Sequence, residues 1–135
     1  MLHIKRWLRI KSGNLKPLSG PKARWEIWVM KRGEVWWINF DPSIGDEIRK
    51  QRPAVIVSND AANYYLNRVQ VVPITSNVDK LYPSEAYVTF RGKKAKAMAD
   101  QLTTVSKKRL INSEGSISYT EMEDIGKAIT TQLDL

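Results

Sequence analysis

The sequence predicts a mainly β domain that ends in an amphipathic α-helix. Short runs rich in β-branched and aromatic residues recur from residue 35 onwards, as strands require. Helical spacing of apolar residues is clear only near the C-terminus. The length of 135 residues is that of one domain. Such a domain buries roughly two thirds of its unfolded surface, enough for a core without disulfides or metal.

The first predicted strand covers residues 35–40. Alternation points Trp36, Ile38 and Phe40 one way, and Val35 and Trp37 the other. Both faces are apolar. The strand is therefore either enclosed in a small barrel with a covering element, or it supplies part of a partner-binding surface.

Two further strands, residues 53–58 and 69–74, are separated by about ten polar, Asn-rich residues of short-helix character. If the strands pair antiparallel and symmetrically about this connection, residues whose numbers sum to about 127 face each other. Arg52 then lies opposite Thr75. An arginine and a hydroxyl at adjacent strand ends predict a site that handles phosphate.

A charged loop, DPSIGDEIRKQ, joins the first two strands. Asp41-Pro42 opens it and Gly45 provides a hinge. Its length and charge allow it to act as a flap over a neighbouring site. The alternative is an ordinary exposed hairpin loop.

The second half of the chain predicts a strand over 85–90, a basic turn over 91–96, a short strand starting at 97–99, and more sheet over 103–106. The basic residues within 93–96 and 107–109 favour solvated turns over ligand contacts. Ser118 and Glu121 form a capping box that opens the C-terminal helix. The apolar stripe of this helix predicts a core or dimer contact and comprises Met122, Ile125, Ile129 and Leu133.

Composition excludes several kinds of chemistry. The absence of cysteine rules out disulfides, a thiolate nucleophile and Cys-ligated zinc, and fits an intracellular location. The one histidine, His3, lies far from the patterned part of the chain, which argues against His-based catalysis and His metal sites. Any chemistry must then use arginine, carboxylates or hydroxyls, and we expect no metal and no cofactor.

Most of the net charge of +8 lies in residues 1–29, which hold seven basic residues against one acidic residue, or +6. Only +2 is left for residues 30–135, so nucleic acid would meet this domain through local patches.

The segment 1–29 has a basic amphipathic start followed by Gly and Pro breaks. It is either an arm that touches nucleic acid or an anionic surface, or a non-native extension upstream of Met30, which we favour. It resembles no secretory signal, and no run approaches transmembrane length.

Between Met30 and Leu135 the chain resembles the MazF/PemK family of toxins, the stable partners in toxin–antitoxin pairs. The resemblance rests on the order and spacing of six motifs: KRGEVWWINFDPSIGDE, RPAVIVSN, VVPITSN, YPSEA, MADQLTTVSKKRL and the terminal helix. Residues 1–29 have no counterpart in the family, which supports the reading as an upstream extension.

The resemblance implies a small SH3-like barrel with a short inter-strand helix and a C-terminal helix, working as a cytoplasmic homodimer. It implies sequence-specific cleavage of single-stranded RNA (mRNA) without metal, inhibiting translation and growth. It also implies a cognate antitoxin whose flexible tail covers the RNA groove, and no membrane contact.

The resemblance also implies roles for particular residues. Arg52 and Thr75 match the catalytic pair, and Glu47 matches the flap glutamate. Asp100 matches an aspartate with a catalytic role in part of the family. The basic residue expected two positions earlier is Met98 here, which favours RNA contact for Asp100 over chemistry. The predicted RNA-binding residues are Arg49, Lys50, Ser76, Asn77, Asp100 and Gln101.

RNA cleavage without metal requires the 2′-OH to attack the adjacent phosphorus, which leaves a 2′,3′-cyclic phosphate and a 5′-OH. Arg52 is suited to stabilise the negative phosphorane, because a guanidinium stays ionised and can hold two phosphate oxygens. Glu47 is a better base than an arginine, and Thr75 can donate a hydrogen bond to the phosphate.

Two other functions are compatible with the same barrel. One is a non-catalytic toxin that grips a protein such as a topoisomerase, and the other is a plain RNA-binding domain. The roles of Arg52 and Thr75 separate these from the nuclease.

Overall fold

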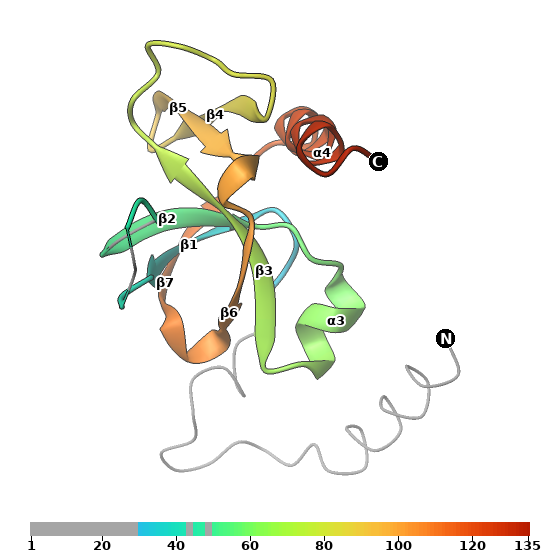
Figure 1. Ribbon diagram of the computed structural model, residues 1–135. Coiled ribbons are helices and arrows are strands. Elements are labelled where there is room, and N and C mark those ends of the chain that lie inside the picture. Colours follow the sequence, from blue (N-terminus) through green and yellow to red (C-terminus); the bar gives the residue numbers. More distant parts are fainter. Residues whose placement is uncertain (1–29, 43–44, 48–49) are drawn as a thin grey trace.

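Figure 1 shows the computed structural model of the protein, which describes residues 30–42, 45–47 and 50–135. The N-terminal extension, residues 1–29, and the flap residue Arg49 lie outside the described residues. Both predictions for them therefore stay predictions.

A curled antiparallel sheet forms the body of the domain, as a half-barrel with α4 packed on one side (Figure 1). The strand order is β4-β5-β3-β2-β1-β7, and β6 also pairs with β3. The strands are β1 (Glu34–Asn39), β2 (Gln51–Ile56), β3 (Arg68–Thr75), β4 (Glu85–Phe90), β5 (Lys93–Met98), β6 (Thr103–Ser106) and β7 (Leu110–Ser116). The helices are α3 (Asp60–Tyr65), α4 (Tyr119–Leu133) and the short turns η1 (Ala99–Gln101) and η2 (Lys107–Arg109). The predicted mainly β class, the inter-strand helix and the C-terminal helix are confirmed.

β3 connects the two halves of the sheet. Its earlier residues pair with β2 and β6, while Ile74 and Thr75 at its end pair with Ala97 and Lys96 of β5. The pairing of β2 with β3 has the predicted register, because Ala54 faces Pro73 and Ile56 faces Val71. Strand pairing is therefore symmetric about the α3 connection, as the sequence predicts.

The two faces of β1 enter two different cores. Trp36, Ile38 and Phe40 belong to a cluster with residues of β2, β3 and β6. Val35 belongs to a second cluster, which α4 covers with Ile125 and Ala128. The prediction that β1 is enclosed holds for this part of the strand. Trp37 lies only half-buried at the other end of the same face as Val35.

The predicted basic turn over residues 91–96 is wrong. Only Arg91 and Gly92 turn, with positive φ of 53° and 74°, and Lys93–Met98 is the strand β5. A two-residue turn with both φ angles positive matches the twist of a hairpin, so β4 leads directly into β5. The prediction placed a turn here because the segment is rich in lysine, which is depleted in strands. The short strand expected to start at 97–99 is the end of β5, followed by η1.

Two of the lysines predicted to be solvated are buried. Lys96 is 6% exposed and Lys107 is 4% exposed. The Lys107 ammonium donates to the backbone carbonyl of Asn63, which joins η2 to α3. Each charge has polar partners inside the fold, which is the condition for burying it.

The C-terminal helix starts as predicted. The Ser118 hydroxyl accepts from the Glu121 N–H, and the Glu121 carboxylate accepts from the Ser118 N–H. Glu121 also accepts from the Thr89 N–H at 2.6 Å, which ties α4 to β4. In the predicted apolar stripe, Ile125 is fully buried but Leu133 is 51% exposed. The stripe therefore packs on the core only along the first part of α4.

Candidate functional site

Hydrogen bonds hold the two ends of the flap together at its base. The Phe40 N–H donates to the Lys50 carbonyl at 2.8 Å, and the Lys50 N–H donates to the Asp41 carboxylate at 2.8 Å. The Arg109 guanidinium donates to the carbonyl of Asn39 at 3.0 Å and to that of Asp41. Arg109 was predicted to be a solvated turn residue. It instead fixes the point at which the loop leaves the sheet.

Arg52 lies on β2 directly after this flap and faces Ile38 of β1. Pro53 follows it, and a residue before proline is held extended. The side chain is half-buried, and its Nε is fully buried with no hydrogen-bond partner among the described residues. A buried guanidinium N–H without a partner is unusual in a folded protein.

Thr75 ends β3. The observed pairing of β2 with β3 stops at Ala54 and Pro73, and Thr75 pairs with Lys96 of β5. The same register continued by two residues would set Thr75 opposite Arg52, so that juxtaposition stays a prediction. The Thr75 hydroxyl accepts from the Asn77 N–H at 3.2 Å, so its own hydrogen remains available to donate.

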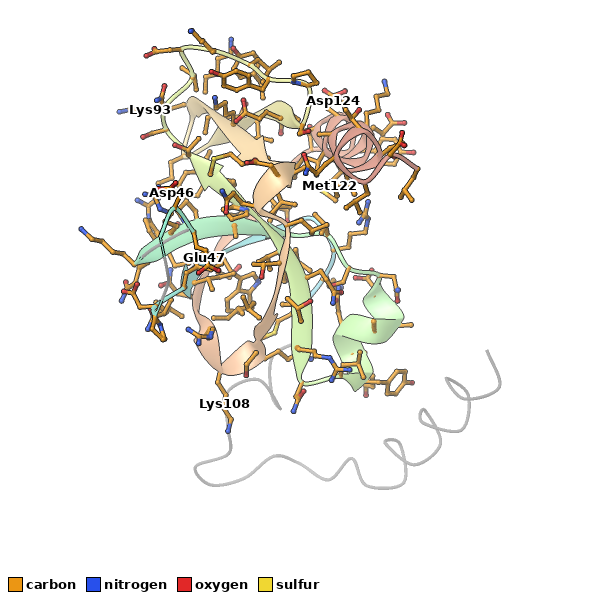
Figure 2. All side chains as sticks on the ribbon, viewed as in Figure 1. Asp46, Glu47, Lys93, Lys108, Met122 and Asp124 are labelled. Atoms are coloured by element: carbon orange, nitrogen blue, oxygen red, sulfur yellow. The ribbon has the colours of Figure 1, made fainter. Side chains whose placement is uncertain are left out.

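A hollow of about 450 Å³ opens beside Arg52 between β1, β2 and the β4–β5 hairpin. Among the residues that the structure describes, five basic side chains line it and no carboxylate does. The lining cations are Lys50, Arg52, Arg91, Lys93 and Lys94. In Figure 2, Lys93 lies on the same side of the molecule as the flap residues Asp46 and Glu47, away from α4. A polyanion would meet a uniformly positive surface here.

Glu47 lies at a second hollow, of about 310 Å³, instead of the first. This hollow also contains Asp100, Gln101 and Arg109. The structure thus divides the predicted site residues into two groups. Arg52, Lys50 and Ser76 line the basic hollow, whereas Glu47, Asp100 and Gln101 line the mixed one.

The loop that follows Thr75 is anchored by a buried ion pair. Lys96, which faces Thr75 in the sheet, lies 2.9 Å from the Glu85 carboxylate and donates to the Lys80 carbonyl at 2.6 Å. Glu85 also accepts from the Tyr82 N–H at 2.9 Å. The loop of residues 76–84 is therefore tied to β4 and β5. Sequence reasoning missed this anchor because its members lie in three separate segments.

In the described part of the chain, no group of three or more His, Cys, Asp or Glu side chains is placed to hold a metal ion. Likewise, no helix among residues 30–42, 45–47 and 50–135 is long and apolar enough to cross a membrane. What the arrangement offers chemically is a set of cationic and hydroxyl donors for an anionic ligand.

The fold and the site together define a small half-barrel domain with a hollow lined by basic side chains. The family model for the PemK-like, MazF-like toxins of type II toxin–antitoxin systems matches residues 31–133. The chain belongs to this family.

Individual relatives agree with this assignment. The chain is 39% identical to endoribonuclease MazF9 of Mycobacterium tuberculosis, over 79% of this chain and 98% of the relative. Among solved structures it is similar to MazF from Deinococcus radiodurans, with a TM-score of 0.70, 23% identity, and coverage of 80% of this chain and 99% of the other. It is also similar to a mycobacterial endoribonuclease in complex with its cognate antitoxin, with a TM-score of 0.67, 24% identity, and coverage of 78% and 96%.

Proposed function

We propose that this protein is the toxin of a type II toxin–antitoxin pair and acts as a sequence-specific, metal-independent endoribonuclease on single-stranded RNA, mRNA above all. Cutting mRNA would stop translation and growth. The observation that carries the proposal is the buried Arg52 Nε without a partner, at the edge of a hollow whose charged lining, within the described part of the chain, is basic. The family match and the named relatives support the same activity.

The reaction proceeds through attack of a ribose 2′-OH on the adjacent phosphorus. The bond from phosphorus to the 5′-oxygen breaks and this oxygen takes up a proton from water, which leaves a 2′,3′-cyclic phosphate and a 5′-OH. Negative charge builds up on the phosphorane oxygens, and a donor already aimed at that charge stabilises it most. Arg52 supplies this donor, since its Nε–H has no competing acceptor within the described residues.

Thr75 and Glu47 complete the proposed catalytic group. The Thr75 hydroxyl donates to a second phosphate oxygen from the strand end beside Arg52. From its place in the flap, Glu47 accepts the proton of the 2′-OH. Because Glu47 lines the mixed hollow and Arg52 lines the basic one, the scissile nucleotide must extend between the two hollows. Lys50 and Ser76 contact RNA at the basic hollow, Asp100 and Gln101 at the mixed one, and Asn77 beside Thr75. Arg49 is proposed as a flap contact from the family resemblance alone.

Three partner and location proposals accompany the activity. The antitoxin binds through a flexible tail that occupies the RNA groove. An acidic or apolar peptide could lie over the cations of this groove. The toxin works as a homodimer, which light scattering of the purified protein tests directly. It acts in the cytoplasm, where its mRNA substrate is.

Cleavage of a single-stranded RNA in the presence of EDTA tests the proposal. We expect the purified protein to cut and Arg52→Ala to lose about 10²- to 10³-fold in rate, the usual loss for one charge-stabilising donor. Arg68→Ala is the matched control, because Arg68 is exposed at the far end of β3. Failure of the wild-type protein to cut any RNA would leave the two non-catalytic functions, and undiminished cutting by Arg52→Ala would refute this mechanism.

A further inference from the structure

Two aromatic rings form the apolar wall of the basic hollow. Trp37 of β1 and Phe90 at the end of β4 meet edge to face, with ring centroids 6.5 Å apart and an interplanar angle of 68°. Both side chains are half-buried, so part of each ring remains accessible. Trp37 pairs in the sheet with Pro53, the residue after Arg52. Arg52 precedes Pro53 and faces Ile38, so it starts from the other face of the strand pair, and it lines the same hollow as the two rings.

Arg91 extends this wall from the β4–β5 turn. Its guanidinium carbon lies 5.3 Å from the Trp37 ring centroid and 5.2 Å from that of Phe90. Glu114 of β7 holds it with two contacts, from Arg91 Nη2 at 2.6 Å and Nε at 3.3 Å. The Arg91 hydrogen bond is the main reason that the pKa of Glu114 is below its ordinary value, and hydrogen bonds from Trp37 and Asn112 add to the effect. Glu114 thus orients the guanidinium before any ligand binds.

The remaining lining determines which ligand fits. Once Glu114 is set against Arg91, the cations Lys50, Arg52, Lys93 and Lys94 are still unbalanced. A flat apolar wall beside several cations matches an unpaired nucleobase with its phosphates. Stacking on aromatic and guanidinium faces together with backbone charge neutralisation is how single strands are generally held.

We propose that this hollow is a nucleobase subsite, in which Trp37, Phe90 and Arg91 stack one base of the single-stranded RNA next to the phosphate held by Arg52. The proposal rests on the proposed nuclease function and extends it to the specificity of the cut. The shape of the subsite then decides which base stands beside the cleaved bond.

A second copy of this chain is a poorer occupant of the same hollow. In a two-fold dimer the same patch meets itself, so a contact centred here would place the cations of one copy against those of the other. RNA removes that repulsion by supplying the opposite charge.

The test measures binding of an RNA that cannot be cut. Once the cleavage sequence is mapped with the wild-type protein, the probe is that oligoribonucleotide with a 2′-deoxy sugar at the cleaved position and 4-thiouridine on either side. We expect Trp37→Ala to weaken its binding about tenfold or more, the loss typical of one stacking contact, while Trp37→Phe stays within about threefold. Tyr64→Ala, which removes an exposed aromatic ring on α3, is the control and should bind as the wild type does.

Light scattering and photocrosslinking make each outcome decisive. The expected result is an unchanged molar mass for Trp37→Ala and a crosslink to the peptide that contains Trp37 or Phe90. If the mass falls together with RNA binding, the hollow is an interface between copies and the proposal is refuted. Wild-type affinity of Trp37→Ala, or crosslinks only outside the hollow, also refutes it and leaves the nuclease function intact. If Trp37→Ala does not fold, Trp37→Phe and the wild-type crosslink decide the question.

Discussion

Arg52 is held in a conformation that suits catalysis better than stability. Pro53 fixes its backbone, and burial of Nε without an acceptor costs the folded protein about 1–3 kcal/mol. A phosphate oxygen at this position would satisfy the donor. Part of the energy of RNA binding can therefore come from a group that is unsatisfied in the free protein.

The proposed role of Glu47 as the base is checked by its substitution with glutamine. An amide cannot accept the 2′-OH proton as a carboxylate does, and general-base catalysis typically contributes about 10²- to 10⁴-fold to the rate. We predict that Glu47→Gln cuts at least about 10²-fold more slowly than the wild type, as measured by single-turnover rates. Asp46→Asn, which changes an exposed neighbour in the flap, is the control and should cut at the wild-type rate. Undiminished cutting by Glu47→Gln would assign the base to another group.

At the scale of elements, the loop 76–84 depends on the pair between Lys96 and Glu85. The two side chains are 7% and 9% exposed. Removing one partner leaves the other charge buried, which commonly costs 3–5 kcal/mol. We predict that Lys96→Met lowers the free energy of unfolding by about 3 kcal/mol in urea denaturation.

Two further variants distinguish the effect of losing the ion pair from the effect of losing any lysine side chain. Lys93→Met changes an exposed lysine of the same strand and should stay within about 0.5 kcal/mol of the wild type. The double variant Lys96→Met/Glu85→Gln should recover part of the loss, because no lone charge remains. A Lys96→Met protein as stable as the wild type would show that the pair does not anchor the loop.

The elements differ in how far the sequence determines them. β2 and β3 are continuous β-branched runs, so their presence and their symmetric register are predictable. β7 is not predicted, because Asn112, Ser113 and Gly115 have low strand propensity. It forms by pairing with β1 across two register shifts.

The candidate site was predictable only where residues are close along the chain or in one ladder. The strand ends that carry Arg52 and Thr75 follow from the β2–β3 pair, while the catalytic pairing of the two residues stays a prediction. The aromatic wall does not, since Trp37, Phe90 and Glu114 come from three strands and meet only after the sheet has curled. The burial of Lys107 also depends on Asn63, 44 residues away.

For the whole molecule, we propose that the toxin domain begins at Met30, since the family match covers residues 31–133. Met30 itself is buried in the core at 3% exposure. We predict that removal of residues 1–29 leaves the melting temperature and the cleavage rate essentially unchanged, measured by calorimetry and by the RNA assay in EDTA. A large loss of cleavage with intact folding would instead identify residues 1–29 as an RNA-binding arm.

The chemistry at Arg52 is the central claim, and the ends of the cut RNA test it most directly. Mass spectrometry of fragments made by the wild-type protein in EDTA should find a 2′,3′-cyclic phosphate, or the 3′-phosphate formed when it opens, and a 5′-OH at each cut. Arg52→Ala should yield no such fragments above background. Fragments with 3′-OH and 5′-phosphate ends, or cutting that requires a divalent metal, would contradict the mechanism.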